Sequence, residues 1–104
     1  MKKECVVKFL ETCKEKTCGE ISSQKCKLKE WKEKIKYYNK FIEHFKSLDR
    51  KDVTVGDRDS FYKTIEARKF LSQHLRNMKK VIKSMDRDVS TINYAIKCLN
   101  EVKE

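Results

Sequence analysis

The chain has 104 residues, of which 38% are hydrophobic and 40% are charged, and it carries a formal net charge of +10. A chain of this length has room for one modest core, so we expect a single domain spanning residues 1–104. No stretch approaches the roughly 20 apolar residues of a membrane-spanning helix, and Lys8 interrupts the first apolar run too early for a signal peptide. The excess of positive charge favours a polyanionic partner, whether nucleic acid, an acidic protein surface or an anionic membrane surface, although lysine can also serve simply as a soluble helix former.

Residues 3–16 carry apolar side chains at helical spacing and predict a short amphipathic helix. Gly19 allows a turn after it, and a serine at 22 or 23 can cap the next helix with its hydroxyl. A helix that continues through Gly19 is the alternative. Apolar residues on both sides of this glycine share one heptad frame, and a glycine inside a helix costs about 1 kcal/mol.

Residues 22–48 predict a second helix, because apolar residues recur there at steps of three and four. We expect Trp31 and the neighbouring aromatic residues to fill a core rather than to stack on a ligand. The apolar seam of this helix consists of Leu28, Trp31, Ile35, Tyr38, Ile42 and Phe45.

Residues 49–59 combine Gly56 with four aspartates, and these turn and capping residues predict a central loop. The next helix then begins at Asp59 or Ser60. The loop lies almost midway along the chain and divides it into halves of nearly equal length. That is the pattern of an antiparallel helical hairpin.

The second half repeats the same periodicity without a further Gly or Pro, which is typical of a helix packed on other helices. Asp86 to Thr91 is its weak point, since aspartate, serine and threonine favour helix ends. We expect a break there, with helices at 60–86 and 89–103. One uninterrupted helix is the alternative, and a second copy of the chain would then cover its free flank. The seam comprises Phe61, Thr64, Arg68, Leu71, Leu75, Met78, Ile82, Met85, Val89, Ile92, Ile96 and Leu99.

These elements together predict an all-α protein, a small bundle of three to four helices built on a long antiparallel helical hairpin. With two Gly and no Pro, little of the chain is divided by turns. The bundle is expected to bury its apolar residues along the seams and to leave the charged residues outside.

Cys5, Cys13, Cys18 and Cys26 follow the symmetric spacing C-x7-C-x4-C-x7-C, and Cys98 stands apart near the C-terminus. If the N-terminal part is itself a helical hairpin, Cys5 faces Cys26 and Cys13 faces Cys18, and two nested disulfides staple it. This arrangement is similar in principle to the twin-cysteine helical hairpin proteins of the mitochondrial intermembrane space, whose usual spacings are nine or three.

Two alternatives to these disulfides are reduced cysteines that serve as small apolar residues, and a Cys5–Cys98 link in a long hairpin. Reduced thiols favour an intracellular, cytoplasmic protein, whereas disulfides favour a secreted or intermembrane-space one. Zinc is not expected, because only Cys13 and Cys18 could form a knuckle and no histidine lies near them. We therefore predict neither a metal site nor a cofactor.

Two stripes of basic residues recur at spacings that place each set on one side of its helix. Like charges at such spacings cost a few tenths of a kcal/mol each, so the stripes are candidates for contacts to phosphate or carboxylate groups. Lysine predominates, which favours attraction without base reading. The predicted binding surface comprises Lys25, Lys29, Lys32, Lys36, Lys40, Lys69, Arg76, Lys79, Lys80, Lys83 and Arg87.

Arg68 and His74 enclose an R-x5-H element in the segment Arg68-Lys-Phe-Leu-Ser-Gln-His74. It resembles the R-x(4–6)-H motif of small helical ribonucleases of the HEPN class, but it lacks the asparagine that commonly follows the arginine. The resemblance implies that Arg68 and His74 would activate and stabilise attack of an RNA 2′-hydroxyl on the adjacent phosphate. No phosphate-binding glycine loop, metal-binding histidine pair or nucleophile elbow accompanies it in the sequence.

The function that these patterns favour is that of a non-enzymatic helical interaction protein, which presents a basic helical surface to an acidic protein or a nucleic acid. A small phage, viral or host-directed effector that acts by occlusion is one such protein. The alternatives are a disulfide-stapled four-helix module, such as a secreted cytokine-like ligand, and a ribonuclease that uses Arg68 and His74.

Overall fold

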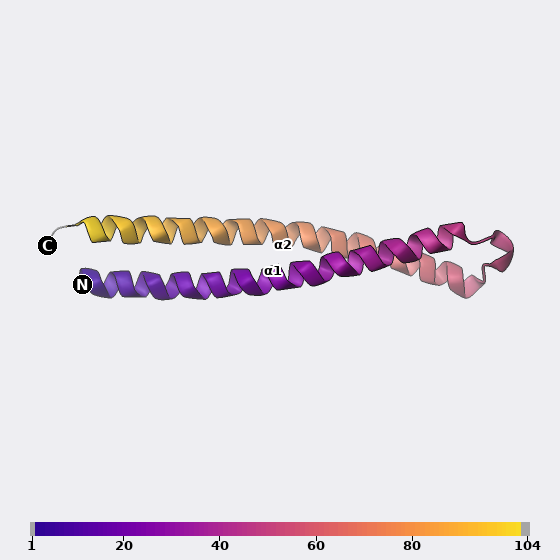
Figure 1. Cartoon of the computed structure of the whole chain (residues 1–104), viewed down its shortest axis with the longest axis horizontal. Coiled ribbons are helices and arrows are strands. Elements are labelled where there is room, and N and C mark those ends of the chain that lie inside the picture. The colour runs from indigo at the N-terminus through magenta and orange to yellow at the C-terminus, as the bar shows by residue number, and fades with distance from the viewer. Residues whose placement is uncertain (1, 103–104) are drawn as a thin grey trace. The chain divides into compact units, whose positions relative to one another are not determined.

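The structure, a computed structural model that describes residues 2–102, consists of two long α-helices and the connection between them (Figure 1). Helix α1 is Lys3–Ser47 and helix α2 is Val55–Glu101, and a single 3₁₀ turn, η1, occupies Arg50–Asp52. The prediction of an all-α protein is therefore confirmed. The prediction of three to four helices is wrong, because two helices take their place. Within the described residues, neither helix contains a stretch long and apolar enough to span a membrane.

Helix α1 continues through Gly19, where the predicted helices 3–16 and 22–48 would have been separated. The seam stays in phase on both sides of this glycine, so packing offsets the cost of about 1 kcal/mol for a glycine inside a helix. The φ angle of Gly19 is not positive. Nothing in its backbone conformation therefore requires a turn.

Helix α2 likewise continues through the second predicted break, between 60–86 and 89–103. Thr91 satisfies its hydroxyl within the helix, since its Oγ1 donates a hydrogen bond of 3.0 Å to the carbonyl oxygen of Arg87. Val89 keeps its place in the seam and is half-buried. The uninterrupted seam thus outweighs the local preference of aspartate, serine and threonine for helix ends.

The residues fall into two units, each of which contains a segment of both helices. Unit 1 comprises residues 2–26 and 79–102, and unit 2 comprises residues 27–78. In unit 1 the start of α1 lies beside the end of α2 (Figure 1), and Lys3 Nζ donates a hydrogen bond of 3.1 Å to the carbonyl oxygen of Val102. Within each unit, the segment of α1 runs antiparallel to the segment of α2.

The predicted seam is the line along which the helices of each unit pack. All of its positions, from Leu28 to Phe45 in α1 and from Phe61 to Leu99 in α2, are buried or half-buried. In unit 2 the rings of Phe45 and Phe61 stack, with centroids 4.2 Å apart and an interplanar angle of 17°. The most deeply buried apolar side chains of the described residues are those of Ile21, Ile42, Leu75 and Ile82.

Two polar side chains in the seam differ in whether they have a hydrogen-bond partner. In unit 2, Arg68 Nη1 donates a hydrogen bond of 3.0 Å to Asn39 Oδ1 on the other helix, and both residues are half-buried. In unit 1, Gln24 Oε1 is buried and has no hydrogen-bond partner among the described residues. A buried amide oxygen without a partner is destabilising, so the apolar seam residues must compensate for it.

The connection is shorter than the predicted loop 49–59, because α2 begins at Val55 rather than near residue 60. Thr54 caps this helix: its Oγ1 accepts a hydrogen bond from the Asp57 amide at 3.1 Å, and its own amide donates to Asp57 Oδ2 at 3.0 Å. This reciprocal pair is a capping box. It satisfies two backbone amides at once and so fixes where α2 starts.

We expect Gly19→Ala to raise the free energy of unfolding by about 1 kcal/mol, since alanine is the better helix former. A Cβ built at Gly19 meets nothing within 4 Å, so the substitution causes no clash. Thermal unfolding followed by circular dichroism should show a midpoint about 4 °C higher or more. An unchanged or lower midpoint would contradict a continuous helix at this point.

The capping box makes stability depend on pH. Hydrogen bonds from the Thr54 backbone and side chain lower the pKa of Asp57 below its ordinary value. Because the folded pKa is the lower one, the stabilisation is present above the ordinary pKa and is lost as pH falls through the folded one. Acid titration of the melting midpoint should therefore show a loss below about pH 4 that is smaller in Asp57→Asn. Asp52→Asn removes a carboxylate from the same connection but leaves the capping box intact, so it serves as the control for the loss of one negative charge.

Candidate polyanion-binding face

Each unit has two flanks that the heptad frame distinguishes. With Leu28 and Phe61 assigned to position a, the seam residues occupy positions a and d along both helices. In an antiparallel pair the e positions of the two helices lie beside each other, with b just outside them. The g positions meet on the other side of the seam, with c just outside them.

The e and b positions of unit 2 form a basic face, to which both helices contribute. Every basic residue on it is exposed, and Glu43 is the single acidic residue at these positions. Five residues of the two predicted stripes, Lys29, Lys32, Lys36, Lys69 and Arg76, therefore lie on one flank within this unit. The basic face consists of Lys29, Lys32, Lys36, Lys46, Arg58, Lys69 and Arg76.

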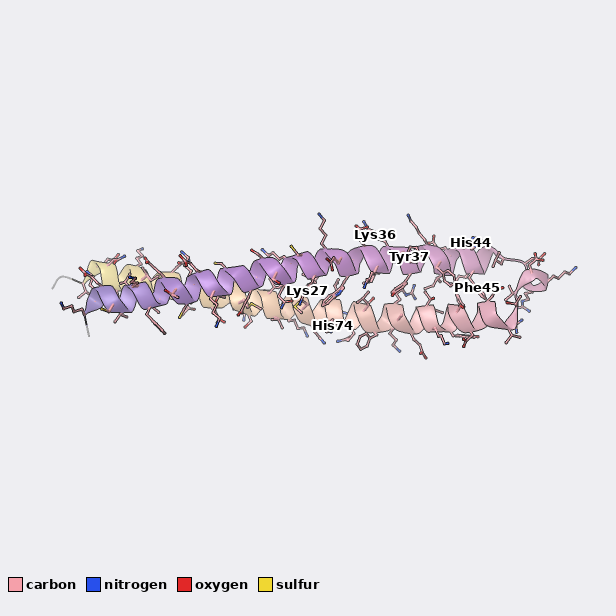
Figure 2. All side chains as sticks on the ribbon, turned by 90° about the horizontal axis from the view of Figure 1, so that it is seen from below. Lys27, Lys36, Tyr37, His44, Phe45 and His74 are labelled. Atoms are coloured by element: carbon pink, nitrogen blue, oxygen red, sulfur yellow. The ribbon has the colours of Figure 1, made fainter. Side chains whose placement is uncertain are left out.

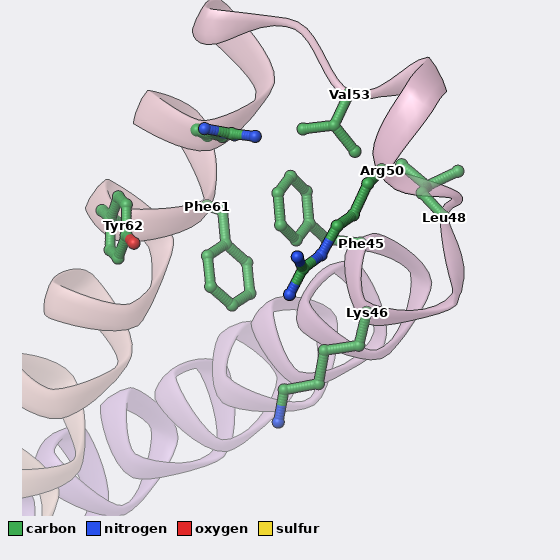
Figure 3. A pocket seen from close by; sticks show the side chains of 8 residues that line it. Phe45, Lys46, Leu48, Arg50, Val53, Phe61 and Tyr62 are labelled. Carbon is green, nitrogen blue, oxygen red and sulfur yellow. The ribbon is translucent and has the colours of Figure 1, made fainter.

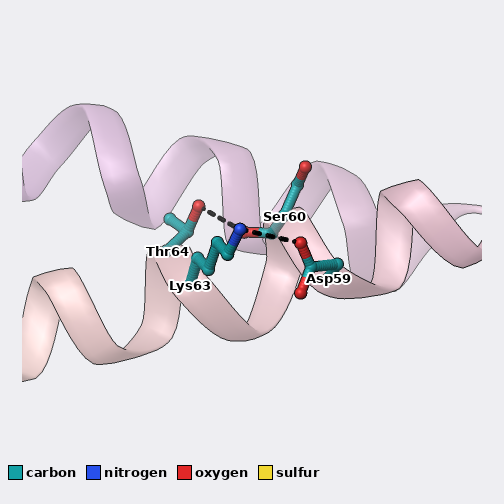
Figure 4. Close-up of polar contacts among 4 residues, drawn as sticks. All are labelled: Asp59, Ser60, Lys63 and Thr64. Atoms are coloured by element: carbon teal, nitrogen blue, oxygen red, sulfur yellow. Dashed lines mark hydrogen bonds and ion pairs between the residues drawn. The ribbon is translucent and has the colours of Figure 1, made fainter.

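Few of these cations are neutralised by acidic side chains. Among the described residues, Lys36 Nζ lies 3.7 Å from Glu33 Oε1, in a pair that is exposed to solvent. The other ion pair joins Lys63 Nζ to Asp59 Oδ2 at 2.9 Å (Figure 4), and Lys63 lies at a c position on the other flank. The remaining six cations of the basic face have no ion-pair partner within the part of the chain that the structure describes.

The other predicted surface residues are also exposed. Three of them lie at e and b positions in unit 1: Lys25, Lys79 and Lys83. The other three lie at position f, on the back of their helix: Lys40, Lys80 and Arg87. Lys46 and Arg58 were missing from the predicted surface. Both lie at position e when the heptad frame is continued from Phe45 to Lys46 and from Phe61 back to Arg58.

The g and c positions of unit 2 form the opposite face, which has a lower net charge and more exposed Tyr and Phe side chains than the basic face. Tyr37 and Phe70 are exposed there to 71% and 72%, and Phe41 is half-buried beside them. Figure 2 shows Tyr37 on α1 and His74 on α2 among all the side chains. Lys27, Lys34 and Lys63 also lie at these positions, together with Glu30, so the two flanks of unit 2 differ in net charge rather than in the presence of cations.

A pocket of about 580 Å³ adjoins the basic face next to the connection (Figure 3). The stacked rings of Phe45 and Phe61 line it, and the Tyr62 ring lies edge-on to Phe61 at 5.7 Å. Figure 3 shows Arg50 and Lys46 extending beside these rings. The lining of the pocket contains three cations and no acidic residue. The residues that line the pocket are Phe45, Lys46, Leu48, Arg50, Val53, Arg58, Phe61 and Tyr62.

Arg68 and His74, the predicted ribonuclease pair, occupy different environments. Arg68 lies in the seam and donates to Asn39. His74 is exposed at position g, where its ring lies 4.6 Å from Trp31 and 6.0 Å from Phe70. No hydrogen bond between Arg68 and His74 occurs among the described side chains, because the helix turns them to different sides.

The structure does not bring together the cysteines that were predicted to pair. Cys5 and Cys26 lie on one continuous helix, about 31 Å apart along its axis, far beyond the reach of a disulfide. The helical hairpin that those pairs require is replaced by uninterrupted α1. All five cysteines are free thiols, and Cys13 alone is half-buried while the others are exposed.

No cluster of three or more His, Cys, Asp and Glu side chains that could hold a metal ion occurs in residues 2–102. Comparison with known proteins gives no family: no protein-family model, no curated protein and no solved structure matches the chain. The function has to be argued from the two flanks and the pocket.

Proposed function

We propose that the protein is a non-enzymatic helical module that binds a polyanion through the basic face of unit 2. One observation carries the proposal: basic side chains from two helices converge on one flank that has a single acidic residue, Glu43. Like charges at such close spacing destabilise the free protein. Phosphate or carboxylate groups bound along this flank would relieve that repulsion.

The pocket beside Tyr62 favours single-stranded nucleic acid among the polyanions. Aromatic rings stack on nucleobases, and neighbouring lysines and arginines neutralise the phosphates. The pocket combines three aromatic residues with three cations. An acidic protein surface would meet the cations but supplies few rings to fill the pocket, and it is the alternative partner.

The proposal is tested by fluorescence anisotropy with a labelled single-stranded oligonucleotide and, separately, with labelled polyglutamate. Because binding releases counterions, the affinity should fall at least about a hundredfold between about 50 and 200 mM salt. Failure of both probes to bind at about 50 mM salt would contradict the proposal. Binding of polyglutamate alone would identify an acidic protein as the partner.

We expect Tyr62→Ala to weaken oligonucleotide binding about tenfold, as the loss of one stacked base would. Tyr94→Ala is the matched control, since Tyr94 is exposed to a similar degree, 70% against 64% for Tyr62, but lies at position f of unit 1. Binding of polyglutamate should be unchanged in both variants. An equal loss in the two variants would show that the pocket does not hold a base.

We also propose that the chain associates with a second copy in the cytoplasm. Four buried apolar residues in the described part of the chain are few for a stable fold of this length, and self-association would bury more apolar surface. The cytoplasm is the compartment in which exposed thiols such as Cys98 persist. Sedimentation velocity under reducing conditions, looking for a species of twice 12.5 kDa, tests the association.

A further inference from the structure

We infer that two copies of the chain pair through the opposite face, the g and c flank, and this inference rests on the self-association proposed above. The structure exposes 8609 Å², whereas a compact monomer of this mass exposes about 6,200 Å². A standard interface buries about 800 Å² of each partner. The described chain thus leaves more surface exposed than a compact fold of its mass, and the excess is larger than the area that such an interface covers on one partner.

The exposed rings of the opposite face each lie next to another ring. Phe70 stacks on His74 with an interplanar angle of 9°, and His74 in turn lies against Trp31. On α1, Tyr37 lies edge-on to Tyr38, with centroids 6.5 Å apart. Rings that are already ordered lose little conformational freedom on binding. Unit 2 thus presents a preorganised aromatic surface.

Unit 1 repeats the pattern with different residues. Phe9 lies at position c and Val81 at position g. Among the described residues of the two helices, four of the seven large exposed hydrophobic residues lie at g or c, which are two of the seven heptad positions. Within each unit, exposed apolar side chains are thus more frequent at g and c than at the other outward positions. The four are Phe9, Tyr37, Phe70 and Val81.

Charge identifies which flank a second copy uses. Two chains of net charge +10 repel each other, and the basic face has seven cations and one acidic residue. On the opposite face of unit 2 the charged residues are Lys27, Glu30, Lys34 and Lys63, and Lys63 is paired with Asp59. Pairing through this flank keeps the repulsion low. It also leaves both basic faces outside, in an isologous arrangement in which the same surface serves both copies.

The experiment compares two double variants by sedimentation velocity, each lacking two exposed aromatic side chains. Tyr37→Gln with Phe70→Gln removes rings from the opposite face, and Tyr62→Gln with Tyr94→Gln removes rings from positions b and f. We expect the first variant to raise the dimer dissociation constant at least about tenfold and the second to leave it unchanged. Circular dichroism of both variants confirms that the helices persist.

Three outcomes distinguish a failure of the pairing face from a failure of the self-association on which it rests. A wild-type chain that is monomeric at all concentrations overturns both the self-association and the face. A wild-type dimer that the Tyr37 and Phe70 substitutions leave unaffected overturns the face alone. A dimer weakened equally by both double variants also overturns it, since general loss of aromatic surface would then be the cause.

Discussion

Leu75→Ala should lower the free energy of unfolding by about 2–5 kcal/mol, the usual cost of a cavity at a buried leucine. Leu75 is one of the four most deeply buried apolar residues in the described chain, so few other contacts can compensate. A typical domain is stable by about 5–15 kcal/mol. The variant would therefore lose a large share of the total, and its helix content should fall at temperatures where the wild type is intact.

Tyr94→Ala is the matched control for this experiment. Tyr94 lies on the same helix, but it is 70% exposed at position f, on the back of α2. Removing its side chain should change stability little, because few of its contacts are lost and alanine has the higher helix propensity. Chemical denaturation monitored by circular dichroism gives both values. Similar losses at Leu75 and Tyr94 would contradict the seam as the source of stability.

Lys32→Gln combined with Lys69→Gln should weaken oligonucleotide binding at least about tenfold at low salt. Both lysines are exposed on the basic face, one on each helix, and neither forms an ion pair among the described residues. Each phosphate contact contributes about 0.7 to the slope of log affinity against log salt for a single strand. Losing two contacts should therefore reduce the slope by about 1.4.

Lys27→Gln combined with Lys34→Gln controls for net charge. These lysines are likewise exposed, but they lie at g positions on the opposite face. The two double variants have the same net charge, so any effect of overall charge is the same in both. The control should keep the wild-type slope. Equal slopes in the two variants would mean that the anion is attracted to the whole chain rather than bound on one flank.

The sequence predicted the packing of the helices better than their ends. The seam was predictable because seam positions recur in phase, and burial confirms each of them. Gly19 and the Asp86 region do not break the helices, since local preferences of about 1 kcal/mol do not interrupt a seam that continues on both sides. The start of α2 was readable from the capping pair Thr54 and Asp57, but the surrounding aspartates looked like loop residues.

Many residues of the candidate site were predictable from the sequence, but their arrangement in space was less so. The stripes of Lys29 and Lys69 were each visible from spacing alone. Their position on one flank follows when the predicted antiparallel pairing is combined with the heptad position of each lysine on both helices of unit 2. The pocket could not be foreseen, because Arg50 and Arg58 were assigned to a loop, where spacing gives no direction to a side chain.

The hydrogen bond from Arg68 to Asn39 has a consequence for how the two helices of unit 2 find their alignment. Asn39 occupies an e position, and the e positions one heptad before and after it are Lys32 and Lys46. If one helix slid by one heptad, the apolar seam would still match, but the arginine would face a lysine instead of an amide oxygen. A slip of one heptad in either direction therefore sets two positive charges against each other, and the Arg68–Asn39 pair favours the observed alignment of the helices.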